Sequence, residues 1–395
     1  MNQFRRRLTL PIGCSILSRL SFSMLIMVLL PLYTKEHGIS DQFYGYAFAI
    51  QSASFVVSSI SGGHLSDILG RKPLIIIGWL IAVISPILLQ SGFLFLSMAF
   101  LGLGSGLNWS AFDAYIADST ESSKLSTSYG LIRGIPQLIA AIGPFLAGYI
   151  VARAATCSQG LTLALWITAG IMGLTVLLAL FLRETKRMAD KKNKKIQFTT
   201  EEKSIIIDYS IVASVVGLGA GLTIPYYAIY YLERFGVDPT QLGTIQTLCC
   251  LFMAIAFLFA GYLGDKVDKL KIWRLCYLVA IPAAFGIITA NALALSTSFY
   301  VGRMAIANMA WPCWTAYLMT KINPRIRGKA LGITWAVDGV SRMIGRAVGG
   351  HVFGLIGGWI FPTAAIMYWL VAVYAVWHLK QPKSSCDMLP PPASK

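Results

Sequence analysis

"SGGHLSDILGRKP", residues 61–73, is a polar, glycine-rich segment between two long apolar runs. About 20 apolar helical residues cross the roughly 30 Å hydrocarbon core of a bilayer, and each of the two runs approaches that length. A short charged segment between two such runs is therefore expected to turn at one surface of a membrane. A related segment, "GYLGDKVDK", returns at 261–269, so the pattern occurs twice in the chain.

The composition extends this reading to the whole chain. Of its 395 residues, 56% are hydrophobic and only 13% are charged, whereas soluble domains average about a quarter charged. The apolar runs are continuous rather than alternating, which predicts helices and excludes a β-barrel. We predict an all-α membrane protein with twelve transmembrane helices, near residues 8–32, 43–61, 73–90, 93–116, 126–152, 160–182, 208–232, 240–263, 272–290, 296–319, 328–356 and 358–379.

The net charge of +16 follows membrane topology and does not indicate a nucleic-acid partner. If the N-terminus lies in the cytoplasm, the segments on that side carry 25 of the 33 Lys and Arg residues, and the outer loops carry Lys35, Arg153 and Arg234. This distribution is the positive-inside bias. We therefore expect a multi-pass protein of the plasma membrane with both termini in the cytoplasm.

The sequence carries no pattern typical of an enzyme or a metal protein. The seven cysteines fall mostly inside apolar runs and the four histidines lie at helix ends or in loops, so no metal site and no cofactor is predicted. No nucleotide-binding loop or nucleophile constellation is found. An ion gradient or the gradient of the substrate itself is the expected energy source.

The chain divides into two halves. Its longest polar stretch, 183–207, separates a predicted six-helix bundle at 1–182 from a second at 208–380, and a cytoplasmic tail follows at 381–395. Rare residues recur at a fixed offset, first of 198 and later of 202 residues: Gly38 with Gly236, Gly45 with Gly243, Gly63 with Gly261, Asp67 with Asp265, Trp109 with Trp311, Gly143 with Gly345, and Gly148 with Gly350. Two repeats in one orientation predict a twofold axis along the membrane normal, with a binding site between halves that rock.

The segment 63–75 resembles a signature of the major facilitator superfamily, and the resemblance covers essentially the whole chain. The matching residues are Gly63, Leu65, Asp67, Gly70, Arg71 and Lys72, and the second copy retains Gly261, Leu263 and Asp265. The resemblance implies two six-helix bundles related by a pseudo-twofold axis. It also implies that this segment latches the halves in the outward-facing state, together with Asp118 at the foot of helix 4. A purely topological role for Arg71 and Lys72 is the alternative.

Residues 130–148, "GLIRGIPQLIAAIGPFLAG", partly match the signature that exporters of this superfamily carry in helix 5. Gly130, Gly143, Pro144 and Gly148 fit, whereas Ile139 and Ala147 stand where the signature has glycine. The resemblance therefore favours the drug:proton antiporter-like groups. Ordinary packing of small residues between membrane helices explains the same pattern.

Seven charged residues lie inside the predicted helices, where a charge left to lipid costs roughly 2.5 kcal/mol or more. They are expected to face protein or water: Arg19, Asp113, Arg133, Arg303, Asp338, Arg342 and Arg346. Five arginines against two aspartates leave a positive surplus, which favours a substrate with a carboxylate, sulfate or phosphate. This surplus and the exporter signature point to different substrates.

The positions of these charges suggest roles. Arg19, near the middle of helix 1 on a face with serines, is predicted to bind substrate, and snorkelling is the alternative. Asp338 and Arg342 share a helix face and are predicted to couple protons, with a static ion pair as the alternative.

The remaining interior charges are expected at gates. Asp113 and Arg133 are predicted to pair across helices 4 and 5, in a structural or gating role. Arg303 and Arg346 lie in the outer parts of helices 10 and 11, where they are expected to close the outer side or attract an anion.

Four aromatic residues are candidate stacking walls for a planar substrate: Trp109, Tyr226, Trp311 and Trp314. An interfacial aromatic belt is the alternative. Together these features predict a monomeric secondary transporter of a small organic solute that works by rocker-switch alternating access, with proton-coupled export as the first interpretation. An organic-anion or sugar-phosphate carrier is the second, and a non-transporting membrane sensor or scaffold is the third.

Overall fold

The computed structural model describes residues 2–119, 134–184, 199–266, 269–321 and 327–378, and all regular secondary structure in these ranges is helical. The first half contains α1 (Asn2–Met24), the π-helix η1 (Leu25–Leu29), α2 (Leu30–Glu36), α3 (Asp41–Leu69), α4 (Arg71–Gln90), α5 (Leu94–Ser119), a helical stretch at 134–140, α7 (Gly143–Arg153) and α8 (Cys157–Leu180). The second contains α9 (Thr200–Thr223), α10 (Tyr226–Phe235), α11 (Pro239–Lys266), α12 (Lys269–Thr289), α13 (Leu293–Lys321), α14 (Arg327–Ile356), the 3₁₀ turn η3 (Gly357–Trp359) and α15 (Ile360–His378).

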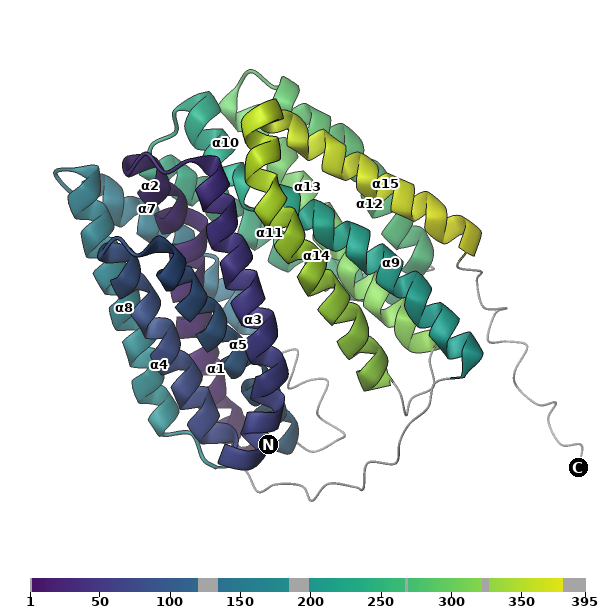
Figure 1. The fold of residues 1–395 in the computed structure, drawn as a ribbon, viewed down its shortest axis with the longest axis horizontal. Helices are drawn as coiled ribbons and strands as arrows, with labels where there is room; N and C mark the ends of the chain where they lie inside the picture. Colours follow the sequence, from purple (N-terminus) through teal and green to yellow (C-terminus); the bar gives the residue numbers. More distant parts are fainter. Residues whose placement is uncertain (1, 120–133, 185–198, 267–268, 322–326, 379–395) are drawn as a thin grey trace, which may run out of the picture.

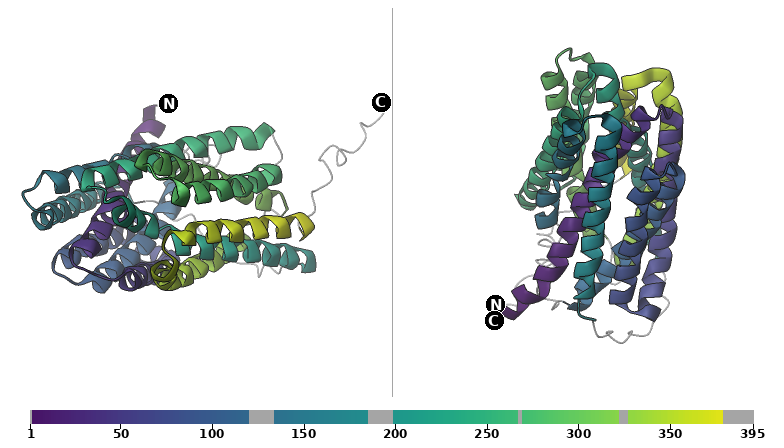
Figure 2. Two further views of the ribbon diagram at one scale, coloured as in Figure 1. Left: turned by 90° about the horizontal axis from the view of Figure 1, so that it is seen from above. Right: turned by 90° about the vertical axis from the view of Figure 1, so that its left-hand side faces the viewer.

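The helices form two groups that join at one end and separate at the other (Figure 1). At the joined end, one hydrophobic core combines residues of both halves, such as Tyr44 and Tyr226. Toward the other end the core divides into a cluster around Trp79 in the first half and a cluster around Trp273 in the second. The view from above shows the same two groups side by side (Figure 2).

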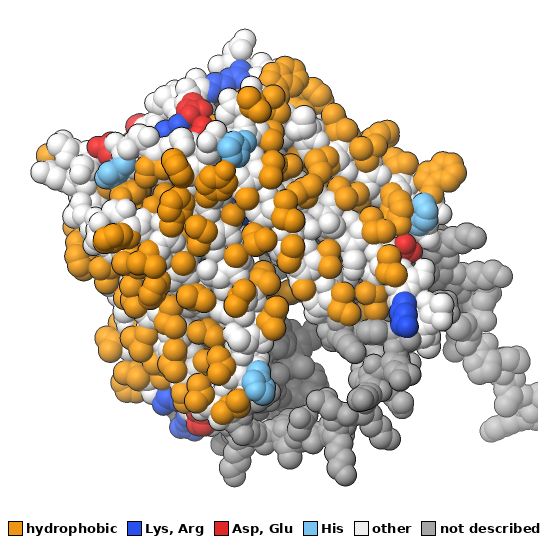
Figure 3. All heavy atoms as spheres, in the orientation of Figure 1, with side chains coloured by type: hydrophobic (Ala, Val, Ile, Leu, Met, Phe, Trp, Pro, Cys, Tyr) orange, Lys and Arg blue, Asp and Glu red, His pale blue; other side chains and the backbone are white. Residues whose placement is uncertain are grey.

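The described surface is that of a multi-pass membrane protein. Nine stretches of the described residues are long and apolar enough to cross a membrane. One of them, Gly332–Ala375, contains most of α14 and most of α15, and α3 and α13 fall outside the nine. Hydrophobic side chains cover the face shown in Figure 3, and most of the visible charged side chains lie near its two ends. The all-helical membrane fold is confirmed, while the number twelve stays a prediction.

The segment 61–73 turns more tightly than the predicted loop. Helix α3 continues to Leu69 and α4 begins at Arg71, so Gly70 alone interrupts the helices within this described segment. The φ of Gly70 is +99°, a conformation open essentially to glycine alone. The backbone N–H of Arg71 donates to Oε1 of Glu184 at 3.1 Å, which ties the turn to the segment after α8.

Prolines divide two of the long helices. Pro225 has no N–H to donate, and the predicted helix 208–232 is accordingly split into α9 and α10 at this point. In the first predicted helix, Pro31 follows the π-helical segment η1. Such a segment has one residue more per turn than an α-helix. Both interruptions lie close to the joined end of the halves.

Two helix pairs make the joint between the halves, α3 with α14 and α7 with α11. A Cβ atom on Gly350 would lie 2.7 Å from the Cα of Gln42. In the second pair, a Cβ on Gly148 would lie 2.9 Å from the carbonyl carbon of Pro239 and 3.3 Å from the Cα of Gly243. Backbones approach this closely only where no side chain separates them.

The two pairs are equivalent under the sequence repeat. Gly45 corresponds to Gly243, and Gly148 corresponds to Gly350. In the structure Gly45 faces Gly350, since a Cβ on Gly45 would lie 3.3 Å from the backbone nitrogen of Gly350, just as Gly148 faces Gly243. The repeat in sequence is therefore also a repeat in space, as the pseudo-twofold arrangement requires.

Polar contacts also cross the joint at its rim. The ammonium group of Lys35 pairs with the carboxylate of Glu233 and lies 3.7 Å from Oδ1 of Asp41. The hydroxyl of Tyr46 and Nε2 of His351 are 2.6 Å apart. These contacts link α2 and α3 of the first half to α10 and α14 of the second.

Candidate functional site

A cavity of about 360 Å³ lies within the first half of the chain. Its described lining comes from α1, η1, α3, α4, α5, α8 and residues 137–140, and Cys250 of α11 is the one described lining residue from the second half. The described lining of this cavity thus comes almost entirely from the first half, whereas the sequence predicted a binding site between the halves.

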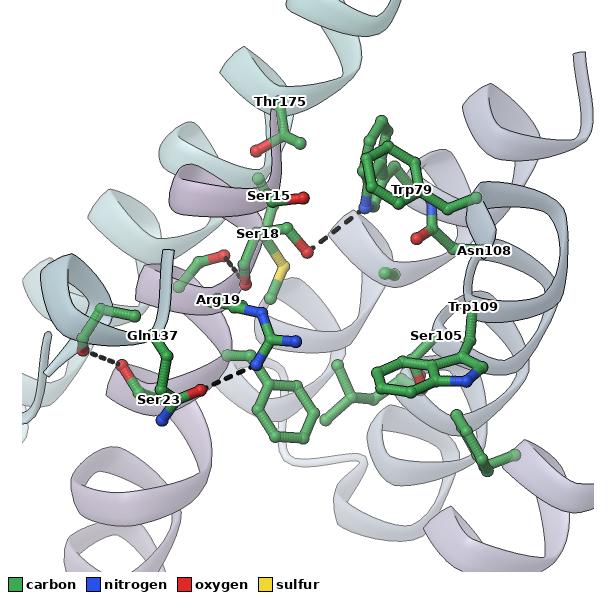
Figure 4. Close-up of a pocket in the computed structure, with 18 of the residues that line it drawn as sticks. Ser15, Ser18, Arg19, Ser23, Trp79, Ser105, Asn108, Trp109, Gln137 and Thr175 are labelled. Atoms are coloured by element: carbon green, nitrogen blue, oxygen red, sulfur yellow. Dashed lines mark hydrogen bonds between the residues drawn. The ribbon is translucent and has the colours of Figure 1, made fainter. Parts of the chain in front are cut away.

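Helix α1 supplies the polar wall of the cavity. Ser15, Arg19 and Ser23 are spaced by four residues and share a face, as the sequence predicted. The Nη1 of Arg19 donates to Oε1 of Gln137 at 2.8 Å, so the guanidinium is held by the helical stretch 134–140. Figure 4 shows the Arg19 side chain reaching from α1 into the space between Gln137 and Trp109.

Helix α5 supplies the opposite wall. Ser105, Trp109 and Asp113 are again four residues apart and all line the cavity. The indole of Trp109 is 37% exposed, and the Phe55 ring lies edge-on to it at 6.4 Å. Trp109 thus offers an aromatic surface to the cavity.

Polar and aromatic groups alternate around the rest of the wall. The indole Nε1 of Trp79 donates to Oγ of Ser18 at 3.3 Å, and the amide of Asn108 donates to the carbonyl of Ile75 at 3.4 Å. Phe22 adds a further ring to the lining. Such a mixture of rings, hydroxyl groups and a few charges is typical of sites for amphipathic organic molecules.

Asp338 and Arg342 are close together but lie outside the described lining of this cavity. The Nε of Arg342 donates to Oδ2 of Asp338 at 2.6 Å within α14. The other carboxylate oxygen, Oδ1, is buried and has no hydrogen-bond partner among the described residues. A Cβ on Gly217 of α9 would lie 2.7 Å from the Asp338 carbonyl, so α9 packs directly against this pair.

Arg346 joins α14 to α3. Its Nη1 donates to Oε1 of Gln51 at 2.9 Å and to the hydroxyl of Ser52, and its guanidinium carbon lies 5.4 Å from the centre of the Phe48 ring. Gln51 also lines the cavity, so one side chain contacts both the cavity and the joint.

Arg303 lies inside the second half rather than at the joint. It is 2% exposed, and its guanidinium carbon is 5.4 Å from the ring centre of Tyr227 and 5.8 Å from that of Tyr368. Its Nε and Nη2 have no hydrogen-bond partner among the described residues. Cation–π contacts with these rings are its main described stabilisation.

Two of the predicted aromatic walls belong to the packed cores. Tyr226 is fully buried, stacks on Phe353 and donates its hydroxyl to the carbonyl of Arg346 at 3.1 Å. Trp314 is 7% exposed and stacks on Tyr209 at 4.2 Å in the second half. Neither contributes to the described lining of the cavity.

Several predicted positions lie outside the described residues. This holds for Arg133 and for the side chains of Asp67, Asp118, Asp265 and Trp311. Of the predicted latch, Gly63 and Gly70 are described in the backbone, Lys72 is half-buried, and the guanidinium of Arg71 donates to Oγ of Ser66. The described contacts of the segment stay within the first half.

Gln51 and Gln137 did not stand out in the sequence, although both contact a predicted arginine. A glutamine inside an apolar run is the signal that could have found them, because an unsatisfied amide is costly in a membrane.

Comparison with known proteins supports the fold. The sequence matches the family described as Major Facilitator Superfamily over residues 12–301 and again over 209–387. Multidrug resistance protein 2 of Bacillus subtilis (strain 168) is 23% identical over 343 residues, which cover 84% of this chain and 85% of that protein. Quinolone resistance protein NorA of Staphylococcus aureus (strain MSSA476) is 24% identical over 346 residues, covering 83% and 85%.

The solved structures agree at the level of the fold. A POT family transporter in complex with 5-aminolevulinic acid superposes with a TM-score of 0.78 at 15% identity, covering 94% of this chain and 96% of the other. Together with the family match over most of the sequence, the joined and separated ends and the repeated glycine contacts are those of a membrane transporter rather than an enzyme. The chain belongs to the Major Facilitator Superfamily.

Proposed function

We propose that this transporter exports a small amphipathic organic compound by rocker-switch alternating access, in exchange for protons. The cavity is the observation that carries the proposal. It brings Arg19, Asp113 and the Trp109 indole into one enclosure of about 360 Å³. That volume falls within the range of roughly 300–1,000 Å³ that suits small organic ligands.

The direction of transport rests on topology. The positive-inside bias supports a cytoplasmic position for the separated end of the halves, where α1 begins and α15 ends. On that assignment both termini are cytoplasmic and the joint closes the outer side. The cavity would then be loaded from the cytoplasm, which suits export across the plasma membrane. A single chain supplies both halves, so we expect the transporter to work as a monomer.

The names of the relatives favour efflux. The two curated relatives are called multidrug and quinolone resistance proteins, and we transfer the broad activity to this chain as a proposal. The partial exporter signature supports it, because Gly148 lies at the joint and a Cβ on Gly143 would lie 2.8 Å from the carbonyl oxygen of Leu20 in α1. Gly148 thus lies where α7 and α11 approach one another at the joint, and Gly143 lies where α7 meets α1 within the first half.

Asp338 is the proposed proton carrier. It is 9% exposed, one of its oxygens accepts from Arg342, and the other has no partner among the described residues. Helix α9 packs directly against this pair, so a small rearrangement of α9 against α14 would change the surroundings of the carboxylate. Proton uptake here would change the packing of α14, one of the four helices that form the joint.

An organic-anion or sugar-phosphate carrier is the second candidate. Arg19 favours it, because arginine is the usual partner of carboxylate and phosphate groups. A sensor or scaffold without transport is the third, and the costly buried charges weigh against it.

The test uses purified protein in proteoliposomes with an imposed pH gradient. Export predicts that a lipophilic aromatic amine or amphoteric compound accumulates on the acidic side beyond its level in protein-free liposomes, where the pH gradient alone traps a weak base. A protonophore should abolish this excess. Accumulation of a sugar phosphate or aromatic carboxylate alone would establish the second candidate. Absence of flux for every compound would overturn transport of these solutes, provided that a thermal unfolding measurement shows the protein in the vesicles to be folded.

A further inference from the structure

Arg303 is a buried charge that the proposed transport cycle does not use. Only 2% of its surface is exposed, and it lies on α13 within the second half, outside the described lining of the cavity. Among the described residues no carboxylate pairs with it. Its Nη1 donates to the sulfur of Met304 at 3.3 Å, and a thioether is a weak and neutral acceptor. The positive charge is therefore uncompensated in the described part of the chain.

Aromatic rings from three helices enclose the guanidinium. Its carbon lies 5.4 Å from the ring centre of Tyr227 on α10 and 5.8 Å from that of Tyr368 on α15. On α13, Tyr300 precedes Arg303 by one turn and packs on Tyr227 with 4.4 Å between the ring centroids. All three rings are buried. Cation–π contacts stabilise a positive charge but do not neutralise it, and a buried charge without a counter-charge is costly.

The unpaired donors of Arg303 lie on one edge of the guanidinium. Nε and Nη2 are both buried, and neither has a hydrogen-bond partner among the described residues. Nη2 is the terminal nitrogen on the same side as the Nε–H bond, so an N–H bond of each points in the same direction. This fork is the geometry with which arginine holds an anion through two parallel hydrogen bonds. The hydroxyl of Tyr227 is a further buried donor that lacks a partner in the described ranges.

We propose that this edge of Arg303 binds a small monovalent inorganic anion, chloride or a similar halide. The near-complete burial of Arg303 leaves access for a small ion rather than for an organic anion. A single charge suits the site, since a divalent ion would leave one negative charge unbalanced. The edges of the surrounding rings carry partial positive charge and suit contact with a halide. The proposal goes beyond the proposed function, because it holds whatever compound the transporter carries.

The bound anion would stabilise the second half. It neutralises Arg303 where α10, α13 and α15 meet, and these helices separate when the chain unfolds. An ion that binds the folded state and not the unfolded state raises stability with its concentration. The protein should therefore become more resistant to heat as chloride is added, until the site is saturated.

The test measures the midpoint of thermal unfolding of the full-length protein in a neutral detergent. The protein is dialysed into sodium gluconate, and chloride then replaces gluconate at constant sodium concentration and pH. For a dissociation constant of about 10 mM, chloride at about 300 mM should raise the midpoint by about 2–4 °C. Bromide should give the same rise. Ion chromatography of the dialysed and then denatured protein measures any chloride that was retained, so a very tight site is also detected.

Two variants of Arg303 and one control assign the response to this residue. Arg303→Gln removes the charge and the fork, so it should abolish both the rise and any retention of chloride. Arg303→Lys keeps the charge without the parallel donors, so the half-saturating chloride concentration should increase about tenfold or more. Arg234→Gln is the matched control, because Arg234 also lies over a tyrosine ring of the second half but is exposed. It should retain the parental response.

The outcomes decide the proposal. A rise with chloride and bromide, or one retained chloride per chain, supports it when Arg303→Gln loses the effect and Arg234→Gln keeps it. Equal chloride responses in the parent and Arg303→Gln would show a general salt effect and overturn the site. A parent midpoint that ignores chloride, together with no retained chloride, would overturn it as well. If Arg303→Gln does not fold, an unchanged half-saturating concentration in Arg303→Lys has the same force.

Discussion

Replacing Gly350 by alanine should weaken the joint between the halves. The new Cβ would lie 2.7 Å from the Cα of Gln42 and 2.8 Å from the carbonyl carbon of Asp41. These are backbone atoms that no side-chain rotation can move, and carbon atoms prefer separations of about 3.5–4.0 Å, so α3 and α14 must part by about 1 Å. Overpacking of this kind typically costs about 1–3 kcal/mol. The joined state should therefore lose about 5- to 150-fold in population relative to the open one.

A disulfide across the rim of the joint measures this loss. In a chain without its native cysteines, Lys35→Cys and Glu233→Cys replace the ion pair that crosses the rim. The rate of oxidative cross-linking should fall about 30-fold in Gly350→Ala, which corresponds to about 2 kcal/mol, the middle of the expected cost. Gly354→Ala, one turn further along α14, is the matched control, because its Cβ would meet nothing within 4 Å. Equal cross-linking rates in the two variants would refute the reasoning.

Three further changes test other parts of the account. Asp338→Asn should abolish proton-driven accumulation and leave exchange of bound substrate, and accumulation that survives in proteoliposomes would exclude Asp338 as the carrier. Gln137→Ala should weaken binding of a transported substrate about 10-fold or more, because it removes the hydrogen bond of 2.8 Å that the charged Arg19 donates. Equilibrium dialysis measures the affinity, and an unchanged affinity for that substrate would show that the amide does not position the guanidinium. Gly70→Ala should destabilise the protein by about 1–3 kcal/mol, measured as a lower midpoint of thermal unfolding, because its φ of +99° and ψ of 160° suit only glycine. Gly63→Ala, with open space around its Cβ, should not lower the midpoint, and equal midpoints would contradict the turn geometry.

The repeat was the part of the fold that could be predicted best. Glycines matched at a fixed offset recur as equivalent structures: Gly38 and Gly236 follow α2 and α10 with φ values of +62° and +58°. A positive φ constrains the residue type strongly, so its trace in the sequence is clear. The exact position of the turn at Gly70 was harder to predict, because the polar residues before it suit either a loop or the end of a helix at a membrane surface.

The orientation of the interior charges was harder to predict. Arg19 and Arg303 both lie inside apolar helices, yet one lines a cavity and the other lies among tyrosine rings. The sequence requires only that such a charge avoid lipid. Which protein surface it meets depends on the rotation of each helix against neighbours far along the chain, and no local pattern records that rotation. Trp314 is a second example. A tryptophan that stacks on Tyr209 in a packed core and a tryptophan that lines a substrate site look the same in the sequence.

The ion pair of Lys35 with Glu233 has a consequence for how such a chain can arise. The two residues are 198 positions apart, the offset that relates the halves in this region, so they are the same position in each repeat and meet across the pseudo-twofold axis. A dimer of two identical six-helix subunits would bring the same residue type together there, and like charges would repel. Opposite charges at this point become possible once the two halves differ in sequence, as they can within one fused polypeptide. Covalent fusion therefore allows an attraction that symmetry forbids to a homodimer.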